Sequence, residues 1–349
     1  MSLKKLMVLG LVLLFAFVAI GCAPAADEPA PPANGDDDDA PPADDAVRVA
    51  LCTSGPITDG GWNTLAYEGL VSIQDEYGFE IAYTENVAQD DQVGVIRDYA
   101  RAGFDVIIGH GFEWGDAMTT VAADFPDIWF AQTGGNSGGT YPNLTSGEFR
   151  TGDAGHVVGT LAAMLTESGI VGFVGAMEIP TIAEEVMSAR ATVESYGYEM
   201  VVGYTGSWTD VSAGYEAAMA QIEEGVDVII GIGNAADGGA IQASEERGGD
   251  VWYIGWTGDL NHLSPDIIAT SMTEDVGAVM REFVRMWLDG EEGEYKQYGI
   301  TEGMKYLGTW ADGVPAEAKE AALEVQQQII DGDLTRLQIF ENLGIEPLI

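Results

Sequence analysis

The chain has 349 residues, of which 46% are hydrophobic, so it is long enough to bury two sizeable cores. Its 57 acidic residues against 14 basic ones give a formal net charge of −43 at pH 7. A field of this sign repels phosphate backbones, so we expect no nucleic-acid partner. The acids are scattered and lysines are few, which is typical of a protein adapted to high salt, where charge repulsion is screened.

The N-terminus has the pattern of an export signal. Lys4 and Lys5 precede a short apolar run, residues 6–20, which ends in small residues before Cys22. A membrane-spanning helix needs about 20 apolar residues, so the run favours a secretory signal peptide over residues 1–21. The final Gly-Cys pair resembles a lipobox, so we expect Cys22 to carry a lipid and hold the chain at the extracytoplasmic face of the cell membrane. An ordinary signal peptide and an uncleaved anchor are the alternatives.

The next segment, residues 22–46, is made of small, acidic and proline residues, with four consecutive Asp at 36–39. It has almost no apolar area to bury, which predicts a disordered acidic tether rather than a metal-binding tail. With Cys22 lipidated, Cys52 has no disulfide partner. Because Cys52 lies inside an apolar run, we expect it to be a small buried core residue.

After residue 46, short β-rich runs alternate with longer amphipathic stretches. The strands are expected at 47–54, 80–87, 105–110, 128–133, 170–175, 199–205, 227–232, 251–256 and 267–272. The helices are expected at 62–77, 90–102, 114–124, 153–167, 181–196, 211–224, 237–247, 275–289 and 315–331. The strands are nearly continuous apolar runs, as in parallel strands covered on both faces. This alternation predicts an α/β fold with Rossmann-like, doubly wound lobes.

An internal repeat indicates two such lobes. Residues 103–112 match residues 225–234, and the strand that follows each copy ends in a similar loop. We therefore expect two lobes joined by a hinge, with chain crossings near 150, 273 and 295. The N-terminal lobe is expected at 47–150 plus 274–295, and the C-terminal lobe at 151–273 plus 296–349. Ligands of such sheets bind beyond the carboxyl ends of the strands, so the loops there are the candidate site.

Several segments, in this order along the chain, carry a family resemblance. They include Thr58-Asp59-Gly60-Gly61-Trp62-Asn63, Gly103-Phe104-Asp105-Val106, Val171-Gly172-Phe173-Val174-Gly175, Gly206-Ser207-Trp208-Thr209-Asp210 and Ala269-Thr270-Ser271-Met272. Together they resemble the basic membrane protein family of periplasmic-type binding lipoproteins, which includes purine-nucleoside receptors. The resemblance implies a type I periplasmic-binding-protein fold and service to the permease and ATPase subunits of an ABC importer. It also implies a purine nucleoside or base as the ligand.

Aromatic residues in the strand-exit loops are candidate ligand contacts. They are Trp62, Phe112, Trp114, Trp208 and Trp256. Rings from opposite lobes can sandwich a flat heterocycle, and stacking is worth about 1–3 kcal/mol per base. Packing in lobe cores or hinges is the alternative. Trp62 and Trp208 are the strongest candidates because each lies in polar, Gly-rich sequence.

Polar candidates lie in the same loops. They are Asn63, Gln132, Thr133, Asn136, Asn234, Asp237 and Asp259. A neutral base presents donors and acceptors, which suit amides and carboxylates. The resemblance singles out Asn63, which matches the family's Asn after the stacking aromatic. Turns and helix caps are the alternative, above all for Asp237 at the start of an expected helix.

Two positions depart from the nucleoside-receptor pattern. The resemblance would place Asp where this chain has Thr257 and Lys where it has Glu274, and both are associated with ribose hydroxyls. We therefore favour a nucleobase-type ligand over an intact nucleoside. Glu274 could instead accept from an amine or a cation, so an amine-bearing solute or a sugar stays open. A sensor subunit that presents its ligand to a membrane receptor is the other functional alternative.

Nothing in the sequence favours an enzyme. The loop at 55–61 lacks the G-x-G-x-x-G spacing, and no Walker loop or nucleophile elbow is present. His110, His156 and His262 are isolated, so we expect no metal and no cofactor. The adjacent Glu184 and Glu185 are expected on a solvated helix face. The expected mechanism is hinge closure around a ligand, read by the transporter.

Overall fold

The computed structural model describes residues 46–149 and 152–348, which belong to one compact unit. The predicted signal peptide, the lipidation site Cys22 and nearly all of the tether lie outside these residues. Among the described residues, no helix combines the length and hydropathy that a membrane crossing requires.

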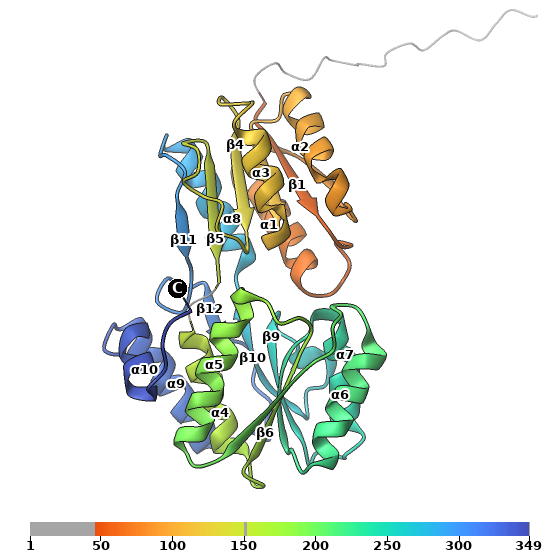
Figure 1. Cartoon of the computed structure of the whole chain (residues 1–349), viewed down its shortest axis with the longest axis vertical. Helices are drawn as coiled ribbons and strands as arrows, with labels where there is room; N and C mark the ends of the chain where they lie inside the picture. The colour runs from red at the N-terminus through yellow and green to blue at the C-terminus, as the bar shows by residue number, and fades with distance from the viewer. Residues whose placement is uncertain (1–45, 150–151, 349) are drawn as a thin grey trace, which may run out of the picture. The chain divides into compact units, whose positions relative to one another are not determined.

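The first sheet has six parallel strands in the order β11-β5-β4-β3-β1-β2 (Figure 1). They are β1 (Arg48–Thr53), β2 (Glu80–Thr84), β3 (Val106–His110), β4 (Trp129–Thr133), β5 (Leu144–Glu148) and β11 (Tyr295–Gln297). One face packs on α1 (Trp62–Tyr77) and α8 (Val276–Leu288). The other packs on α2 (Gln92–Arg101) and α3 (Gly115–Ala122), with Cys52 buried there as a free thiol. We call this sheet and its helices the first lobe.

The second sheet has the order β12-β10-β9-β8-β6-β7, and its strands are parallel except for the antiparallel pair β10–β12. They are β6 (Ile170–Gly175), β7 (Glu199–Tyr204), β8 (Val228–Ile232), β9 (Trp252–Thr257), β10 (Ile268–Glu274) and β12 (Lys305–Leu307). We call this sheet and its helices the second lobe. The pattern of both sheets is the expected α/β architecture.

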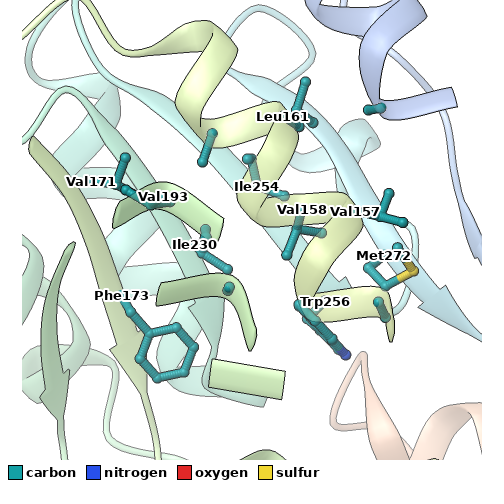
Figure 2. Close-up of a cluster of buried hydrophobic side chains, with 14 of the residues drawn as sticks. Val157, Val158, Leu161, Val171, Phe173, Val193, Ile230, Ile254, Trp256 and Met272 are labelled. Atoms are coloured by element: carbon teal, nitrogen blue, oxygen red, sulfur yellow. The ribbon is translucent and has the colours of Figure 1, made fainter. Parts of the chain in front are cut away.

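Helices cover both faces of the second sheet. One face carries α4 (Asp153–Leu165), α5 (Pro180–Ser195), α9 (Ala316–Ile330) and α10 (Arg336–Leu343). The other carries α6 (Val211–Glu223) and α7 (Asp237–Glu245). Figure 2 shows Val157, Val158 and Leu161 of α4 among the apolar side chains of the sheet. Short 3-10 turns occur at Gln89–Asp91, Phe112–Trp114, Asn234–Ala236 and Asn261–Leu263.

The expected helices and strands are all present, with bounds shifted by a few residues. Four further elements, β5, β11, β12 and α10, were not predicted from the sequence. Strand β5 is a mixed segment, Leu-Thr-Ser-Gly-Glu, and β11 and β12 have three residues each, so none carries a clear apolar period.

The chain passes between the sheets after β5, between β10 and α8, and between β11 and β12. The first crossing includes residues 150 and 151, outside the described range. Strand β11 belongs to the first sheet, so the third crossing follows Gln297, close to the expected position near 295. In the first sheet the chain runs from β1 to β2 on one side and then to β3 on the other. In the second sheet it runs in the same way from β6 to β7 and then to β8. Ligands bind beyond the carboxyl ends of strands at such switch points.

Candidate functional site

A cavity of about 310 Å³ lies at the carboxyl ends of the strands of both sheets. The first lobe lines it with Ser54, Gly55, Pro56, Asp59, Trp62, Asn63, Gly111, Phe112, Glu113, Gly134 and Phe149. The second lobe lines it with Ile179, Ile182, Glu185, Trp208, Thr209, Ile232, Asn234, Trp256, Thr257 and Glu274. The volume is at the lower end of the roughly 300–1,000 Å³ usual for small-molecule sites.

Trp62 begins helix α1 and is held by its neighbours. Its ring stacks on the His110 ring at 4.1 Å with 28° between the planes, and Phe149 meets it edge-on at 6.1 Å. A Cβ at Gly134 would lie 2.9 Å from Trp62 Cζ2, so only glycine permits this approach. One face of the indole is therefore packed inside the protein while the residue remains half-buried at the cavity.

His110 fixes Trp62 through its own two nitrogens. Nε2 is 2.9 Å from the Trp62 carbonyl oxygen, which can only accept, so Nε2 carries the proton. Nδ1 is 2.5 Å from Thr133 Oγ1 and accepts from that hydroxyl. Burial lowers the pKa of His110 to about 3, against smaller opposing effects of the Trp62 carbonyl and Asp59. The imidazole is therefore neutral near pH 7.

The carboxylate of Asp59 organises the loop between β1 and α1. It accepts from the backbone N–H groups of Gly61, Asn63 and Thr64, which would otherwise lack acceptors at the start of α1. The Asn63 amide also donates to Asp59, over 2.8 Å. Burial works to raise the pKa of Asp59, but these hydrogen bonds and one from Asn234 together lower it.

Asn234 connects the two lobes. Its Nδ2 donates to Asp59 Oδ2 over 3.0 Å, and its Oδ1 accepts from the Trp62 N–H over 3.2 Å. Its φ of +55° is left-handed, which Asn tolerates better than most residues. A Cβ at Gly61 would lie 2.0 Å from Asn234 Oδ1, so glycine at that position makes the contact possible. We call these two hydrogen bonds the Asn234 bridge.

A cluster of three charged side chains supports the second-lobe wall of the cavity. Lys305 on β12 is the antiparallel register partner of Glu274 on β10, and its Nζ is 3.4 Å from Glu274 Oε1. Lys305 also forms an ion pair with Glu185 of α5. The side chains of Lys305, Glu185 and Glu274 are 1%, 2% and 10% exposed, so water screens the cluster little. We call these three residues the Lys305 cluster.

Further hydrogen bonds hold the carboxylates of the cluster. Trp256 Nε1 donates to Glu274 Oε1 over 3.2 Å, and the Gly155 N–H donates to Glu185 Oε2 over 3.0 Å. Burial raises the pKa of Glu274, and Lys305 opposes that shift. Burial works to lower the pKa of Lys305, but Glu185 and Glu274 raise it above its ordinary value. Lys305 therefore keeps its positive charge between two carboxyl groups.

The structure brings most of the residues expected from the sequence to this cavity. Those that line it are Trp62, Asn63, Phe112, Trp208, Asn234, Trp256, Thr257 and Glu274. Asn136 does not line it. Thr257 has a φ of +71°, which is strained for a β-branched side chain and costs on the order of 1–3 kcal/mol. The expected residues in the two halves of the sequence thus meet at one place.

The other expected site residues lie behind the wall of the cavity or beside it. Trp114 is fully buried in the core between α2 and α3 and the first sheet. Buried Gln132 donates to the carbonyls of Gly111 and Phe112, and buried Thr133 bonds His110, so both support the loops that line the cavity. They do not line it themselves.

The two expected aspartates bond protein groups. Asp237 accepts from the Tyr253 hydroxyl over 2.8 Å, and burial raises its pKa to about 7. Asp259 lines a neighbouring cavity of about 280 Å³ and accepts from the backbone and hydroxyl of Thr309. Neither lines the 310 Å³ cavity.

The Lys305 cluster was not predicted from the sequence, and the prediction that Glu184 and Glu185 lie on a solvated helix face is wrong. The two glutamates are 0% and 2% exposed. Glu184 pairs with Arg336 of α10, and Glu185 pairs with Lys305. The available signal was the spacing of Ile182 and Glu185, which puts both on one side of α5, together with the rarity of lysine in this chain.

A family model described as ABC transporter substrate-binding protein PnrA-like matches residues 46–335. The chain belongs to this family. The resemblance to the basic membrane protein family is thereby confirmed. Members are binding proteins rather than enzymes, so the chain is an ABC transporter solute-binding protein whose partners are a small solute and the transporter components.

The names of the relatives refer to different ligands. A purine-binding protein of Brucella abortus is 27% identical over 298 residues, which cover 84% of this chain and 83% of the relative. A putative ABC transporter glucose-binding protein of Haloferax volcanii is 27% identical over 302 residues, covering 84% and 75%. A solute-binding protein of an ABC transporter system from Aeropyrum pernix K1 has the same fold, with a TM-score of 0.74 at 21% identity, covering 85% of this chain and 97% of that one. The family is thus established, while its members differ in substrate.

Proposed function

We propose that this solute-binding protein captures a purine-type nucleobase or nucleoside between its two lobes for an ABC importer. The observation that carries the proposal is that Trp62 of the first lobe and Trp208 of the second, both half-buried, line the same cavity. Rings from two walls can hold a flat heterocycle by stacking on both of its faces. The purine-binding relative from Brucella abortus is in keeping with such a ligand.

The setting of Trp62 supports this role. The His110 ring covers one indole face, so the ring is fixed before any ligand arrives and little side-chain entropy is lost on binding. Asn63 follows directly and gives its amide protons to Asp59, which leaves its carbonyl oxygen to accept from a base N–H. The polar groups beside the ring are therefore oriented by the protein itself.

Lobe closure is the proposed mechanism. The Asn234 bridge joins the lobes at the edge of the cavity, and a ligand that contacts both walls favours the bridged form. Solution scattering with and without adenosine measures this shift. A smaller radius of gyration is expected with adenosine, and an unchanged curve at saturation would argue against closure.

A thermal-shift screen tests the ligand class. Adenine, guanine, adenosine, guanosine, glucose and spermidine are compared, because a ligand of the folded state raises the melting temperature. A purine or purine nucleoside is expected to give the largest shift. If glucose alone stabilises the protein, the purine proposal is wrong and the sugar alternative replaces it.

Substitution of the two tryptophans tests the stacking. Trp62→Ala and Trp208→Ala are each expected to weaken the best purine ligand more than tenfold in calorimetry, since stacking is worth about 1–3 kcal/mol. Trp310→Ala is the matched control, because Trp310 is partly buried in the second lobe and does not line the cavity. Equal losses in all three variants would assign them to folding rather than to ligand contact.

We further propose that Cys22 carries a lipid and anchors the protein outside the cell membrane. The apolar run before Cys22 and the acidic segment after it support this. Cys22→Ser is expected to abolish labelling by a fatty-acid probe and to release the protein from the membrane fraction. Membrane retention without label would indicate an uncleaved apolar anchor instead.

A further inference from the structure

A buried pair of side chains, Asp237 and Tyr253, lies in the second lobe and does not line the cavity. Asp237 is the first residue of α7 and is 3% exposed, and Tyr253 on β9 is fully buried. The Tyr253 hydroxyl donates to Asp237 Oδ1 over 2.8 Å. An acidic residue in the first turn stabilises a helix, but that role requires neither burial nor a tyrosine. Burying a carboxylate costs free energy, so we expect this one to hold a specific structure in place.

Two glycines at the end of β8 make room for the pair. A Cβ at Gly231 would lie 1.6 Å from the Tyr253 hydroxyl oxygen and 2.9 Å from Asp237 Oδ1. A Cβ at Gly233 would lie 2.7 Å from Asp237 Oδ1. Gly233 has a φ of −122°, outside the left-handed region, so the close contact accounts for glycine there. The backbone beside the pair is therefore shaped to accept it.

The carboxylate of Asp237 faces the turn that connects β8 to α7. Burial raises the pKa of Asp237 to about 7, and hydrogen bonds from the Tyr253 hydroxyl and from the backbone of Gly233 and Asn234 oppose that shift. The 3-10 turn Asn234–Ala236 lies between these backbone groups and Asp237 itself. Asp237 therefore fixes the turn from both of its ends, and Tyr253 fixes Asp237 to the next strand.

This turn makes contacts that shape the cavity. Asn234 forms the bridge to the first lobe, with bonds of 3.0 Å to Asp59 and 3.2 Å from the Trp62 N–H. The Ala236 N–H donates to the Trp208 carbonyl over 3.3 Å. Protein N–H···O bonds span about 2.7–3.2 Å, so a displacement of the turn by about 0.5 Å would break the longer bond of the bridge. The bridge thus depends on the position of the turn.

We propose that the Asp237–Tyr253 pair is a positioning device for lobe closure: it fixes the turn Asn234–Ala236 so that Asn234 reaches the first lobe. A turn that is already ordered loses little conformational freedom when the lobes close, which favours the bridged form. Neither residue of the pair lines the cavity, so the pair acts through Asn234. The inference rests on the proposed function for lobe closure and not for the identity of the solute.

Hydrogen exchange at the Trp62 N–H measures the bridge in the full chain without a ligand, because this group donates to Asn234 of the other lobe. The chain has eight tryptophans, so isotope labelling of tryptophan alone gives few signals in nuclear magnetic resonance spectra. Trp129 is the internal reference, since its N–H donates to the Asp105 carbonyl within the first lobe. Exchange through unfolding of the first lobe would affect both groups, and loss of the bridge affects Trp62 alone.

Two substitutions in the second lobe test the inference. Asp237→Asn removes the charge of the pair and keeps its shape, and Tyr253→Phe removes the hydroxyl that holds Asp237. Each is expected to speed exchange at Trp62 about tenfold and to change exchange at Trp129 less than twofold. Unchanged exchange at Trp62 in both variants, or equal acceleration at Trp129, would overturn the inference.

Tyr215→Phe is the matched control. The Tyr215 hydroxyl donates to Glu246 over 2.8 Å at the surface of the same lobe, so this variant loses a tyrosine–carboxylate bond away from the turn. Its exchange at Trp62 is expected to stay within twofold of the unsubstituted protein. Acceleration equal to that of Tyr253→Phe would overturn the assignment to the buried pair.

A double substitution tests whether the pair acts through Asn234. The bridge is already absent in Asn234→Gly, so adding Asp237→Asn is expected to change exchange at Trp62 by less than twofold. A further tenfold acceleration would overturn the inference, because the pair would then act on the first lobe by another route.

Calorimetry with adenosine separates this inference from the purine proposal. Asp237→Asn is expected to bind adenosine about tenfold more weakly than the unsubstituted protein. If the unsubstituted protein does not bind adenosine while exchange at Trp62 responds as expected, the purine proposal loses its support and the role of the pair stands. If adenosine binds and exchange at Trp62 does not respond to either substitution, the inference fails and the purine proposal stands.

Discussion

The two walls of the cavity are built in different ways. In the first-lobe wall, the loop before α1 is stabilised by local hydrogen bonds: Asp59 and its backbone donors lie within five residues of one another. The second-lobe wall is stabilised over long range: Lys305 pairs with Glu185, 120 residues away, and with Glu274 across two strands. The hydrogen bonds of the loop before α1 can form together with α1, while the Lys305 cluster requires β10, β12 and α5 to be in place.

Breaking the Lys305 cluster is expected to have the largest effect. Lys305→Met removes the cation that pairs with buried Glu185 and Glu274, and removing one partner of a buried ion pair costs about 3–5 kcal/mol. Denaturant unfolding measures this loss in the free energy of unfolding.

Lys296→Met is the control for that substitution. Lys296 pairs with Glu282 and Glu294, but its side chain is 31% exposed, so a loss of about 1 kcal/mol or less is expected. Similar losses in the two variants would mean that burial of the Lys305 cluster does not raise the cost of removing its cation.

Removing the Asn234 bridge tests the contact between the two lobes. Asn234→Gly keeps the left-handed backbone but deletes both inter-lobe hydrogen bonds, one of them to a carboxylate. We expect ligand affinity to fall by about 2 kcal/mol, since a hydrogen bond to a charged group is worth about 1.5–3 kcal/mol. Calorimetry measures the affinity, and unfolding is expected to change less.

Asn86→Gly is the matched control for this variant. Asn86 has a φ of +57°, nearly that of Asn234, and does not line the cavity. Its substitution has the same backbone effect and is expected to leave affinity unchanged. A comparable loss of affinity there would mean that the backbone, not the bridge, matters.

The smallest expected effect is a pH dependence of the first wall. The pKa of His110 falls from 6.5 to about 3 on folding because the ring is buried, so the unfolded chain binds a proton that the folded chain does not. Stability contributed by neutral His110 is present above pH 6.5 and is lost progressively as the pH falls toward 3. Between pH 7 and 5.5 the loss amounts to about 1 kcal/mol.

Other buried groups titrate in the same range. His156, whose pKa burial lowers to about 4, acts in the same direction. Asp237, whose pKa burial raises to about 7, contributes stability at low pH that is lost as the pH rises through 7. The slope of the unsubstituted protein minus that of His110→Gln isolates His110, with His262→Gln on the surface as control. Parallel slopes in all three proteins would contradict the assignment.

The difference between local and long-range contacts also explains which features of the protein the sequence could predict. The fold followed from alternating apolar and amphipathic runs, which are local. Trp62, Asn63 and Trp208 were found because each lies in a polar, Gly-rich loop after a strand, where a core residue is unexpected. The sequences of these loops therefore indicate a binding site without information about the other lobe.

Other residues could not be placed from the sequence, because their position depends on the direction of the side chain or on a partner far away in the sequence. Phe112 and Trp114 have similar sequence surroundings, but the 3-10 turn that holds both leaves Phe112 51% exposed and turns Trp114 into the core. Asp237 bonds Tyr253 on β9. Lys305 lies on a three-residue strand with no recognisable period, so its pairing with Glu274 is visible only once the register of β10 and β12 is known.

The register of Glu274 and Lys305 has an evolutionary consequence. The two residues face each other, so exchanging them would present an ammonium to the solute in place of a carboxylate, with no change in backbone. Either single step, Glu274→Lys or Lys305→Glu, places like charges together in a buried setting and destabilises the protein. A change at one member of the pair therefore depends on a change at the other, so the two charges are expected to be inherited together.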